Sequence, residues 1–354
     1  MKKSVQFLLI IFILTPVFKL FSQVEFTGYG STGIRLFERP IAIGASQEVY
    51  FEGKFQAEIK VNKDIEAQLD FRGSSDDENV TLREFSAKFE YWERMKIEVG
   101  NIKQPFGLEQ MISNEDLELV EESFIHNRVS DFGYAARSVS IMVYSKYKEE
   151  YKTFPFSYYF SFFKNNSFTS GLYTRLSYHQ NNFIYSLNYA YHSIGGNYPF
   201  KANAVCGDIT FNPKDIRISI EVFYVKNTEA VLENIVLNGD ENIYATGAKL
   251  LAAKIFDIDG KFVKGLEPVL LFGYFVPDYD EKDFHTLQFV PGFNIYFHDD
   301  VRLRLNYSGL MTKNRFNTEY SSLNSLGTVE LQVGFDDKNL CIIINYYYLF
   351  FFRM

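Results

Sequence analysis

The chain has 354 residues, of which 47% are hydrophobic, 18% aromatic and 23% charged, and its formal net charge is −8. This composition excludes a disordered protein, because the chain has enough apolar side chains to bury a large core or to face lipid. The two cysteines, Cys206 and Cys341, are too few for a disulfide framework, and the negative charge argues against a nucleic-acid partner.

The N-terminus has the three-part layout of a secretory signal. Residues 1–3 are basic, residues 5–14 are almost all apolar, and Pro16 ends that run before Ser22. The apolar run is too short to cross a bilayer of ~30 Å as a helix. We therefore expect residues 1–22 to be a signal peptide. Its removal takes away three lysines and no acid, which changes the net charge to −11.

Apolar and polar residues alternate with a period of two along most of the remaining chain. Between Phe51 and Val61 the odd positions are apolar or glycine and the even positions are Glu, Lys or Gln; residues 62–64 then turn the chain into a similar stretch. This pattern predicts strands in hairpins, since a helix would need apolar residues three and four apart. We count sixteen strands, near 26–36, 49–61, 65–73, 82–91, 95–104, 138–146, 156–164, 172–179, 183–193, 203–211, 216–225, 244–254, 266–275, 287–298, 301–310 and 327–335.

The strand lengths separate a soluble sandwich from a membrane barrel. Many strands have about nine to eleven residues, the length that a tilted strand needs to cross a bilayer, whereas sandwich strands usually have about five or six. Aromatic residues such as Trp92 and Tyr307 lie near strand ends, where the aromatic girdles of a barrel would be. Short connections alternate with long ones such as 105–137 and 311–326. The fold class expected is all-β, a transmembrane antiparallel β-barrel in the lipid of the bacterial outer membrane, with charged side chains facing the lumen.

Residues 103–137, after the fifth strand, are too many for an ordinary connection. Pro105 would end the strand by removing a ladder donor, and Gly107 would permit a sharp bend inward. Ser113 or Asn114 could cap a short helix. We expect this segment to fold into the lumen; the alternative is an external loop.

A block in this region carries a family resemblance. Residues 99–109, Val-Gly-Asn-Ile-Lys-Gln-Pro-Phe-Gly-Leu-Glu, resemble the G-x-x-K-x-P-F-G-x-E segment of the phosphate-selective porin O and P family. Residues 121–124, 132–137, 291–307 and 331–335 are similar to further blocks of that family. The resemblance implies a homotrimeric, sixteen-stranded outer-membrane channel whose third loop is folded into the pore, with Pro105, Phe106 and Gly107 shaping that loop.

The residues expected to line the pore and its constriction carry both signs of charge. They are Lys54, Arg72, Lys88, Lys96, Arg302 and Arg304 on the strands, and Lys103, Glu109, Glu115, Asp116, Glu118, Glu121, Glu122, Arg128 and Arg137 in the loop. Phosphate selectivity needs a concentrated column of Arg and Lys. A mixed set would pass cations or zwitterions as readily as phosphate.

No pattern of a catalytic or metal site stands out. The five histidines have no paired zinc-binding spacing, and no GxSxG elbow occurs. A barrel lipase could still bring a serine to His179 or His192 from a neighbouring strand, because geometry defines a catalytic triad. We expect no enzyme, no cofactor and no metal.

Residues 336–354 do not fit a barrel formed by residues 23–335. Phe335 ends an alternating strand, yet an apolar run follows from Leu340 to Phe352. A seventeenth strand would break the even number usual in bacterial barrels, so a missed strand, a tail packed outside and an altered reading frame remain open. The function expected is passive diffusion of small hydrophilic or charged solutes, among them anions such as phosphate. The alternative is a non-conducting barrel whose outer loops bind partners or polysaccharide.

Overall fold

The computed structural model describes residues 24–37, 47–76, 78–148, 154–165, 169–236, 242–281, 283–314 and 317–336. Within these ranges the chain is mainly β-strand, and the strands form one sheet. The expected signal peptide, residues 1–22, lies outside the described residues, as does the expected tail beyond Asp336.

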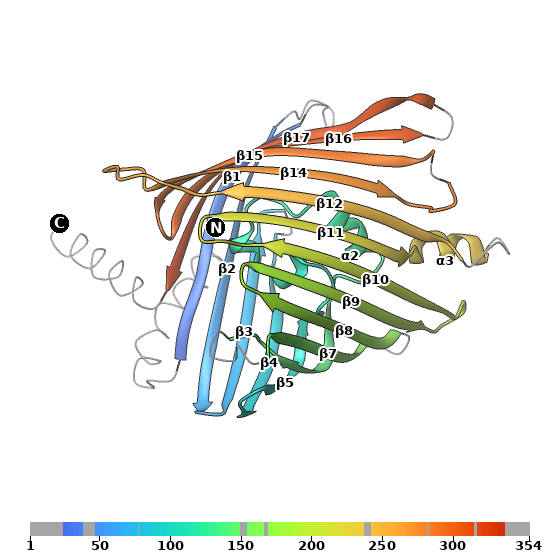
Figure 1. The fold of residues 1–354 in the computed structure, drawn as a ribbon, viewed down its shortest axis with the longest axis horizontal. Helices are drawn as coiled ribbons and strands as arrows, with labels where there is room; N and C mark the ends of the chain where they lie inside the picture. Colours follow the sequence, from blue (N-terminus) through green and yellow to red (C-terminus); the bar gives the residue numbers. More distant parts are fainter. Residues whose placement is uncertain are drawn as a thin grey trace.

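The sheet is antiparallel and closes on itself (Figure 1). Its strands are β1 (Val24–Phe37), β2 (Gln47–Asn62), β3 (Ile65–Ser74), β4 (Val80–Trp92), β5 (Met95–Lys103), β6 (Arg137–Ser145), β7 (Phe156–Asn165), β8 (Thr169–Gln180), β9 (Phe183–Ile194), β10 (Phe200–Phe211), β11 (Ile216–Lys226), β12 (Tyr244–Lys254), β13 (Phe256–Asp257), β14 (Gly265–Val276), β15 (His285–His298), β16 (Val301–Asn314) and β17 (Asn317–Asp336). Closure is complete because β1 pairs with both β2 and β17. The short β13 continues β12 along β14, so the barrel has sixteen full strands, as predicted.

The two faces of the barrel wall differ in chemistry, because successive residues of a strand point to opposite sides. On the outer face Phe85, Phe162 and Leu187 are more than half exposed, whereas the inward-facing Ser86 and Asn188 are fully buried. An apolar exterior is what a bilayer requires of a barrel. None of the helices in the described ranges is long and apolar enough to span a membrane.

The last hairpin is longer than predicted. The sequence predicts a loop over residues 311–326, but β16 and β17 extend through most of it, and Lys313 pairs with Tyr320. Ladder hydrogen bonds satisfy the backbone whether or not the side chains are apolar. The strands therefore continue beyond the alternating stretches by which they were recognised.

In the described part of the chain two α-helices connect strands: α2 (Phe124–Asp131) between β5 and β6, and α3 (Thr228–Val236) between β11 and β12. Ser123 caps α2, because its Oγ accepts a hydrogen bond from the backbone N–H of His126 at 3.2 Å. The sequence analysis did not predict either helix.

A short helix forms after Ser113, as expected, but it is a single 3-10 turn without the expected side-chain cap. Only a 3-10 turn, Asn114–Asp116, forms there, after a first such turn at Glu109–Met111, and the Ser113 side chain makes no capping hydrogen bond. The backbone carbonyls that follow this turn bind the barrel wall, so the segment stays extended.

An apolar core inside the barrel joins α2 and α3 to the wall from β7 to β14. Its members are Phe106, Ile125, Val129, Phe132, Tyr134 and Ala135 after β5, Val231 on α3, and Phe163, Tyr173, Ala190, Phe200, Ala202, Ala204, Cys206, Phe223, Val225, Ala245 and Phe275 on the wall. Small inward residues make room for α2: a Cβ at Gly273 would lie 3.0 Å from Ile125 Cδ1. This side of the interior is packed with side chains rather than open.

Candidate functional site

The segment predicted to fold inward begins with a bend at Pro105, Phe106 and Gly107. Gly107 has φ +83°, a left-handed conformation that glycine adopts without strain. Phe106 is buried, and its ring centroid lies 5.7 Å from that of Tyr134 and 6.4 Å from that of Tyr173. The bend therefore directs the chain away from β5 and into contact with the opposite wall.

A buried salt bridge, which we call the anchor triad, holds this bend. It consists of Glu109 in the loop, Glu221 on β11 and Lys249 on β12. Lys249 Nζ lies 3.0 Å from Glu109 Oε1 and 2.7 Å from Glu221 Oε2. Leu108 N donates a further hydrogen bond to Glu221 Oε1 at 2.7 Å. Burial opposes ionisation of Glu109, but Lys249 holds the pKa of this carboxyl below its usual value.

Beyond the anchor triad, the backbone of residues 115–119 runs along β16. Arg302 Nη2 donates a hydrogen bond to Leu117 O at 3.1 Å, and Arg304 Nη1 donates one to Leu119 O at 3.0 Å. Hydrogen bonds from charged donors are the stronger kind. The two arginines of the wall therefore fix the path of the loop backbone, in addition to lining space.

Three acidic side chains of the loop pair with basic side chains of the wall. The pairs are Glu115 with Lys54 at 2.6 Å, Glu118 with Arg217 at 2.5 Å and Glu121 with Arg35 at 3.0 Å. Because β2 and β11 are far apart along the closed sheet, the segment crosses the interior between them. Burial raises the pKa of Glu118 and Glu121 despite these partners, and burial with the neighbouring Glu115 raises the pKa of Asp116.

Three sizeable hollows lie among the described residues of the interior. The turn-side hollow, of about 490 Å³, lies beside the short connections at residues 212–215 and 299–300. The middle hollow, of about 250 Å³, lies between the loop and the wall from β2 to β7. The loop-side hollow, of about 420 Å³, lies near Asp76 and α2. The middle hollow therefore has the smallest volume of the three.

The hollows form one series, because neighbours share lining residues. Tyr29 lines all three, Glu115 lines the turn-side and middle hollows, and Arg72, Arg83 and Arg137 line the middle and loop-side hollows. Tyr29 is only 4% exposed, and its hydroxyl donates a hydrogen bond to Glu52. A continuous path through the barrel would pass Tyr29.

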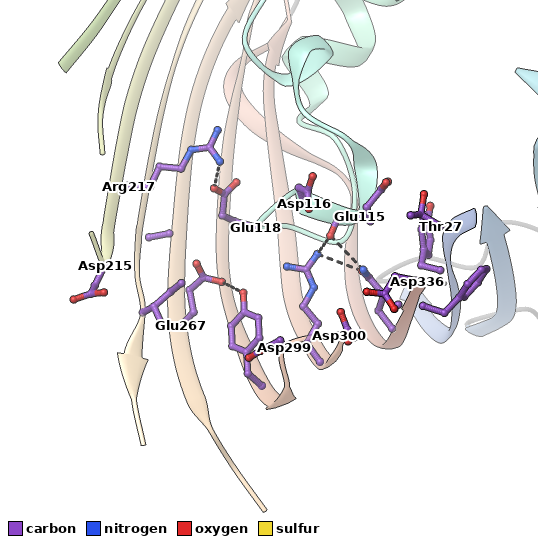
Figure 2. A pocket seen from close by; sticks show the side chains of 18 of the residues that line it. Thr27, Glu115, Asp116, Glu118, Asp215, Arg217, Glu267, Asp299, Asp300 and Asp336 are labelled. Carbon is purple, nitrogen blue, oxygen red and sulfur yellow. Dashed lines mark hydrogen bonds and ion pairs between the residues drawn. The ribbon is translucent and has the colours of Figure 1, made fainter. Parts of the chain in front are cut away.

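The turn-side hollow is acidic, and Figure 2 shows several of its carboxylates together with Arg217. Among the described residues its acidic members are Glu115, Asp116, Glu118, Asp215, Glu267, Asp299, Asp300 and Asp336, and its basic members are Lys214, Arg217 and Arg302. Negative charge thus dominates this end of the path.

The middle hollow has the opposite balance. Among the described residues its basic members are Lys54, Arg72, Arg83, Lys88, Lys103, Arg137 and Lys146, and its acidic members are Asp70, Glu84, Glu98 and Glu115. In the loop-side hollow the arginines Arg35, Arg72, Arg83, Arg137 and Arg304 face Glu52, Asp76, Glu121, Glu122 and Glu330. The sign of the charge therefore changes along the path.

Most basic side chains of the middle hollow have an acidic partner. Arg72 lies 2.5 Å from Glu52, and Arg137 lies 2.7 Å from Glu84. The guanidinium of Arg83, in contrast, has no hydrogen bond or ion pair with the described residues, and the ammonium of Lys146 has none either. Among the described residues Lys103 donates only to a carbonyl, Ile112 O, at 2.9 Å. These three cations are therefore the positive charges of the middle hollow that have no acidic partner in the described part of the chain.

The residues predicted from the sequence fall into four groups. Lys54, Arg72, Lys88, Lys103, Glu115 and Arg137 line the middle hollow; Glu115, Asp116, Glu118 and Arg302 line the turn-side hollow; Arg72, Glu121, Glu122, Arg137 and Arg304 line the loop-side hollow; Glu109 belongs to the anchor triad. Lys96 pairs with Glu90, and Arg128 pairs with Glu229 of α3 at 2.7 Å, so neither lines a hollow.

Sequence reasoning missed Arg83 and Tyr29. Arg83 lies at a β-bulge, where the pairing of β3 with β4 shifts register after Asp70. The signal was present: Arg83 and Glu84 are adjacent polar residues in an otherwise alternating strand, and an extra residue that re-aims a side chain is what a bulge provides. Tyr29 lies on β1 among glycines and small polar residues, where alternation alone gives no hint of a narrow passage.

Two further groups of side chains resemble parts of known kinds of site. One could ligate a metal ion, and the other is a serine beside a histidine. Cys206, Asp208 and Glu221 place ligand atoms within 4.8 Å of one another, but Arg175 already binds Asp208 at 2.9 Å and Lys249 binds Glu221. These carboxylates are thus neutralised by cations.

A serine also meets a histidine, as the lipase alternative requires. Ser157 Oγ lies 2.9 Å from His179 Nε2, and Tyr147 stacks on the imidazole at 4.4 Å. In the described ranges no carboxylate contacts this histidine, so the pair lacks the third group of a triad.

The fold is found in solved porin structures. The anion-selective porin from Comamonas acidovorans superimposes with a TM-score of 0.64 at 14% identity, over 88% of this chain and 99% of that chain. Salmonella typhi OmpF in complex with daunomycin gives 0.63 at 13% identity, over 88% and 97%. Vibrio cholerae OmpT in its trimer form gives 0.57 at 10% identity, over 88% and 99%. No curated protein is significantly similar in sequence.

The closed sixteen-stranded barrel with the porin fold, its apolar exterior and the family match define the class of protein, a diffusion channel of the bacterial outer membrane. Residues 39–188 match the family of phosphate-selective porins O and P. The match includes the Lys-x-Pro-Phe-Gly block and confirms the resemblance on which the sequence analysis relied. Family and fold together indicate a channel rather than an enzyme.

Proposed function

We propose that the channel prefers small hydrophilic solutes that carry a negative charge, and that the path runs through the three hollows past Tyr29. The observation that carries this proposal is the excess of basic side chains around the middle hollow, where Arg83 and Lys103 have no acidic partner among the described residues. Residues 103–137 form the constriction in this proposal, because side chains of this segment line all three hollows.

The acidic turn-side hollow would favour cations instead. The distance between a solute and the charged side chains decides which of the two hollows has the larger effect. The middle hollow has about half the volume of the turn-side hollow, so a solute in it stays closer to the charged side chains. At roughly 5 Å in water one unit charge changes the energy of a permeating ion by about 0.8 kcal/mol, which is about fourfold in permeability. Salt screens the same charge over about 10 Å at 0.1 M. In this proposal the charges of the smallest hollow therefore dominate selectivity.

The test is the reversal potential of the purified protein in a planar bilayer under a potassium chloride gradient. We expect an anion-selective potential that Arg83→Gln and Lys103→Gln each reduce, by about fourfold in the permeability ratio. Lys261→Gln is the matched control, because Lys261 is exposed in the β13–β14 connection, away from the hollows. Cation selectivity would contradict the proposed preference, and a silent barrel would favour the non-conducting alternative.

The assembly proposed is a homotrimer in outer-membrane lipid. The support is the likeness to a porin solved in a trimer form and the family resemblance. Light scattering of the purified protein, corrected for detergent, measures the mass directly. We expect three chains per particle, and a monomeric mass would overturn this assembly.

A further inference from the structure

The middle hollow is lined by an acidic side chain, Asp70, and one of its two carboxylate oxygens has no hydrogen-bond donor in the described structure. Asp70 on β3 is 4% exposed, and its Oδ1 has no hydrogen-bond partner in the described structure. Its Oδ2 lies 3.7 Å from Lys54 Nζ, but Lys54 is closer to Glu115, at 2.6 Å. Leaving a buried carboxylate oxygen without a donor is costly. Such an atom is expected to take a donor from a molecule in the hollow.

A second acceptor lies at the boundary of the same hollow. Glu115 lines both the middle and the turn-side hollows, and its Oε2 has no hydrogen-bond partner in the described structure. Its Oε1 is the atom that accepts from Lys54. Asp70 and Glu115 thus offer two carboxylate oxygens without a donor, on side chains that both contact the Lys54 ammonium.

Uncompensated donors line the hollow too. Arg83 is the extra residue of the β-bulge that comes directly after the Asp70–Glu84 pair. It therefore lies on β4, next to the strand β3 that carries Asp70. No ion pair joins Arg83 to Asp70, although both line the hollow. Lys103 contributes an ammonium whose only hydrogen bond to the described residues is to a carbonyl. The hollow therefore presents both signs of unsatisfied charge.

Each class of solute would meet this arrangement differently. An anion can bind Arg83 and Lys103 but leaves Asp70 without a donor, and a cation leaves Arg83 without an acceptor. A zwitterion satisfies both, because its carboxylate accepts from a guanidinium while its ammonium donates to carboxylates. The volume of about 250 Å³ suits a molecule of amino-acid or dipeptide size.

We propose that the middle hollow is a binding site for zwitterions of amino-acid or dipeptide size. The solute carboxylate binds Arg83 and Lys103, and the solute ammonium binds Asp70 and Glu115. This inference rests on the proposed function, since it takes the hollow to be part of the conducting path, and it adds the ammonium as a required group.

The test compares three solutes of one backbone in the full-length channel. Alanylalanine is the zwitterion, N-acetyl-alanylalanine the anion and alanylalanine amide the cation. Each is added to a planar bilayer, and the concentration that halves the ion current is measured. We expect the zwitterion to act at a concentration about tenfold lower than either derivative. Equal block by the zwitterion and the acetylated anion would overturn the site while leaving anion preference intact.

Variants assign the two ends of the solute. Asp70→Asn keeps the shape and should raise the half-blocking concentration of alanylalanine about tenfold, to that of its acetylated form. Arg83→Gln should raise it to that of the amide. Asp280→Asn is the control, because Asp280 is exposed in the β14–β15 connection. An unchanged half-blocking concentration in Asp70→Asn would refute the role of this carboxylate.

A silent channel would refute the proposed function without deciding on the site. Calorimetric titration of the detergent-purified protein with the same three dipeptides therefore runs in parallel. Tighter binding of the zwitterion, lost in Asp70→Asn, supports the site whether or not current flows. No difference among the three dipeptides in this titration overturns it.

Discussion

Replacing Lys249 by methionine removes the cation of the anchor triad and keeps the length of the side chain. The side chains of Lys249, Glu109 and Glu221 are 6%, 9% and 6% exposed. The substitution leaves two carboxylates facing each other with no counter-charge. Removing one partner of a buried ion pair costs about 3–5 kcal/mol, because the remaining charge is buried and unpaired. We expect Lys249→Met to lose stability in that range at neutral pH.

The pH dependence of this loss has a definite sign. In the wild type Lys249 holds the pKa of Glu109 below its usual value, so this group stabilises the fold at neutral pH and that contribution is lost as the pH falls. Without Lys249, burial and the like charge of Glu221 raise the pKa of Glu109, so the variant is penalised more as the pH rises. The stability difference should shrink from pH 8 to pH 5.

Urea unfolding in detergent, followed by the fluorescence of the single Trp92, measures both effects. Lys60→Met is the matched control, because the Lys60–Glu25 pair is exposed and its loss should not be measurable. Adding Glu109→Gln to Lys249→Met should recover part of the stability. A variant within about 1 kcal/mol of the wild type, or a loss that grows toward pH 5, would refute the anchoring role of the triad.

Three further outcomes follow from the constriction segment. Deleting residues 115–122 should raise single-channel conductance, because the deleted residues separate the turn-side and middle hollows; unchanged conductance would place the segment outside the path. Lowering the pH from 7 to 5 should increase anion preference, since burial raises the pKa of Asp116, Glu118 and Glu121 and these groups become neutral sooner than ordinary carboxyls; the reversal potential measures this, and a shift toward cations would contradict it. Phe106→Ala should cost about 3–5 kcal/mol in urea unfolding, because the ring is 1% exposed; a loss below about 1 kcal/mol would show that the bend does not depend on it.

The barrel was predictable because its determinants are local. A period of two, repeated over strands long enough to cross a bilayer, gives strand number and direction without knowledge of tertiary contacts. The helix α3 was missed although its signal was present: Val231, Leu232, Ile235 and Val236 have helical spacing within a long connection. The extension of β16 and β17 was missed for the opposite reason, since backbone pairing there needs no apolar alternation.

The site was predictable in its residue types but not in its pairings. Glu109 and Lys249 are far apart in the sequence, and only the packed loop brings them together. Arg72 and Arg83 look alike in the sequence, as basic residues near the ends of adjacent strands. Arg72 is neutralised by Glu52, whereas the bulge turns Arg83 into the hollow without an acidic partner among the described residues. Whether a basic side chain has an acidic partner depends on register shifts between strands. The alternation of apolar and polar residues in the sequence does not reveal these shifts.

The net charge of −11 expected for the mature chain therefore says little about what the channel passes. A permeating ion responds to charges within about a Debye length, which is ~8–10 Å at 0.10–0.15 M salt. The acidic residues that dominate the total include those of the turn-side hollow, which has the larger volume. The basic excess lies around the middle hollow, which has the smaller volume. In the selectivity that we propose, the sign of the uncompensated charge in the smallest hollow decides, so a strongly acidic chain can form a channel that prefers solutes that carry a carboxylate.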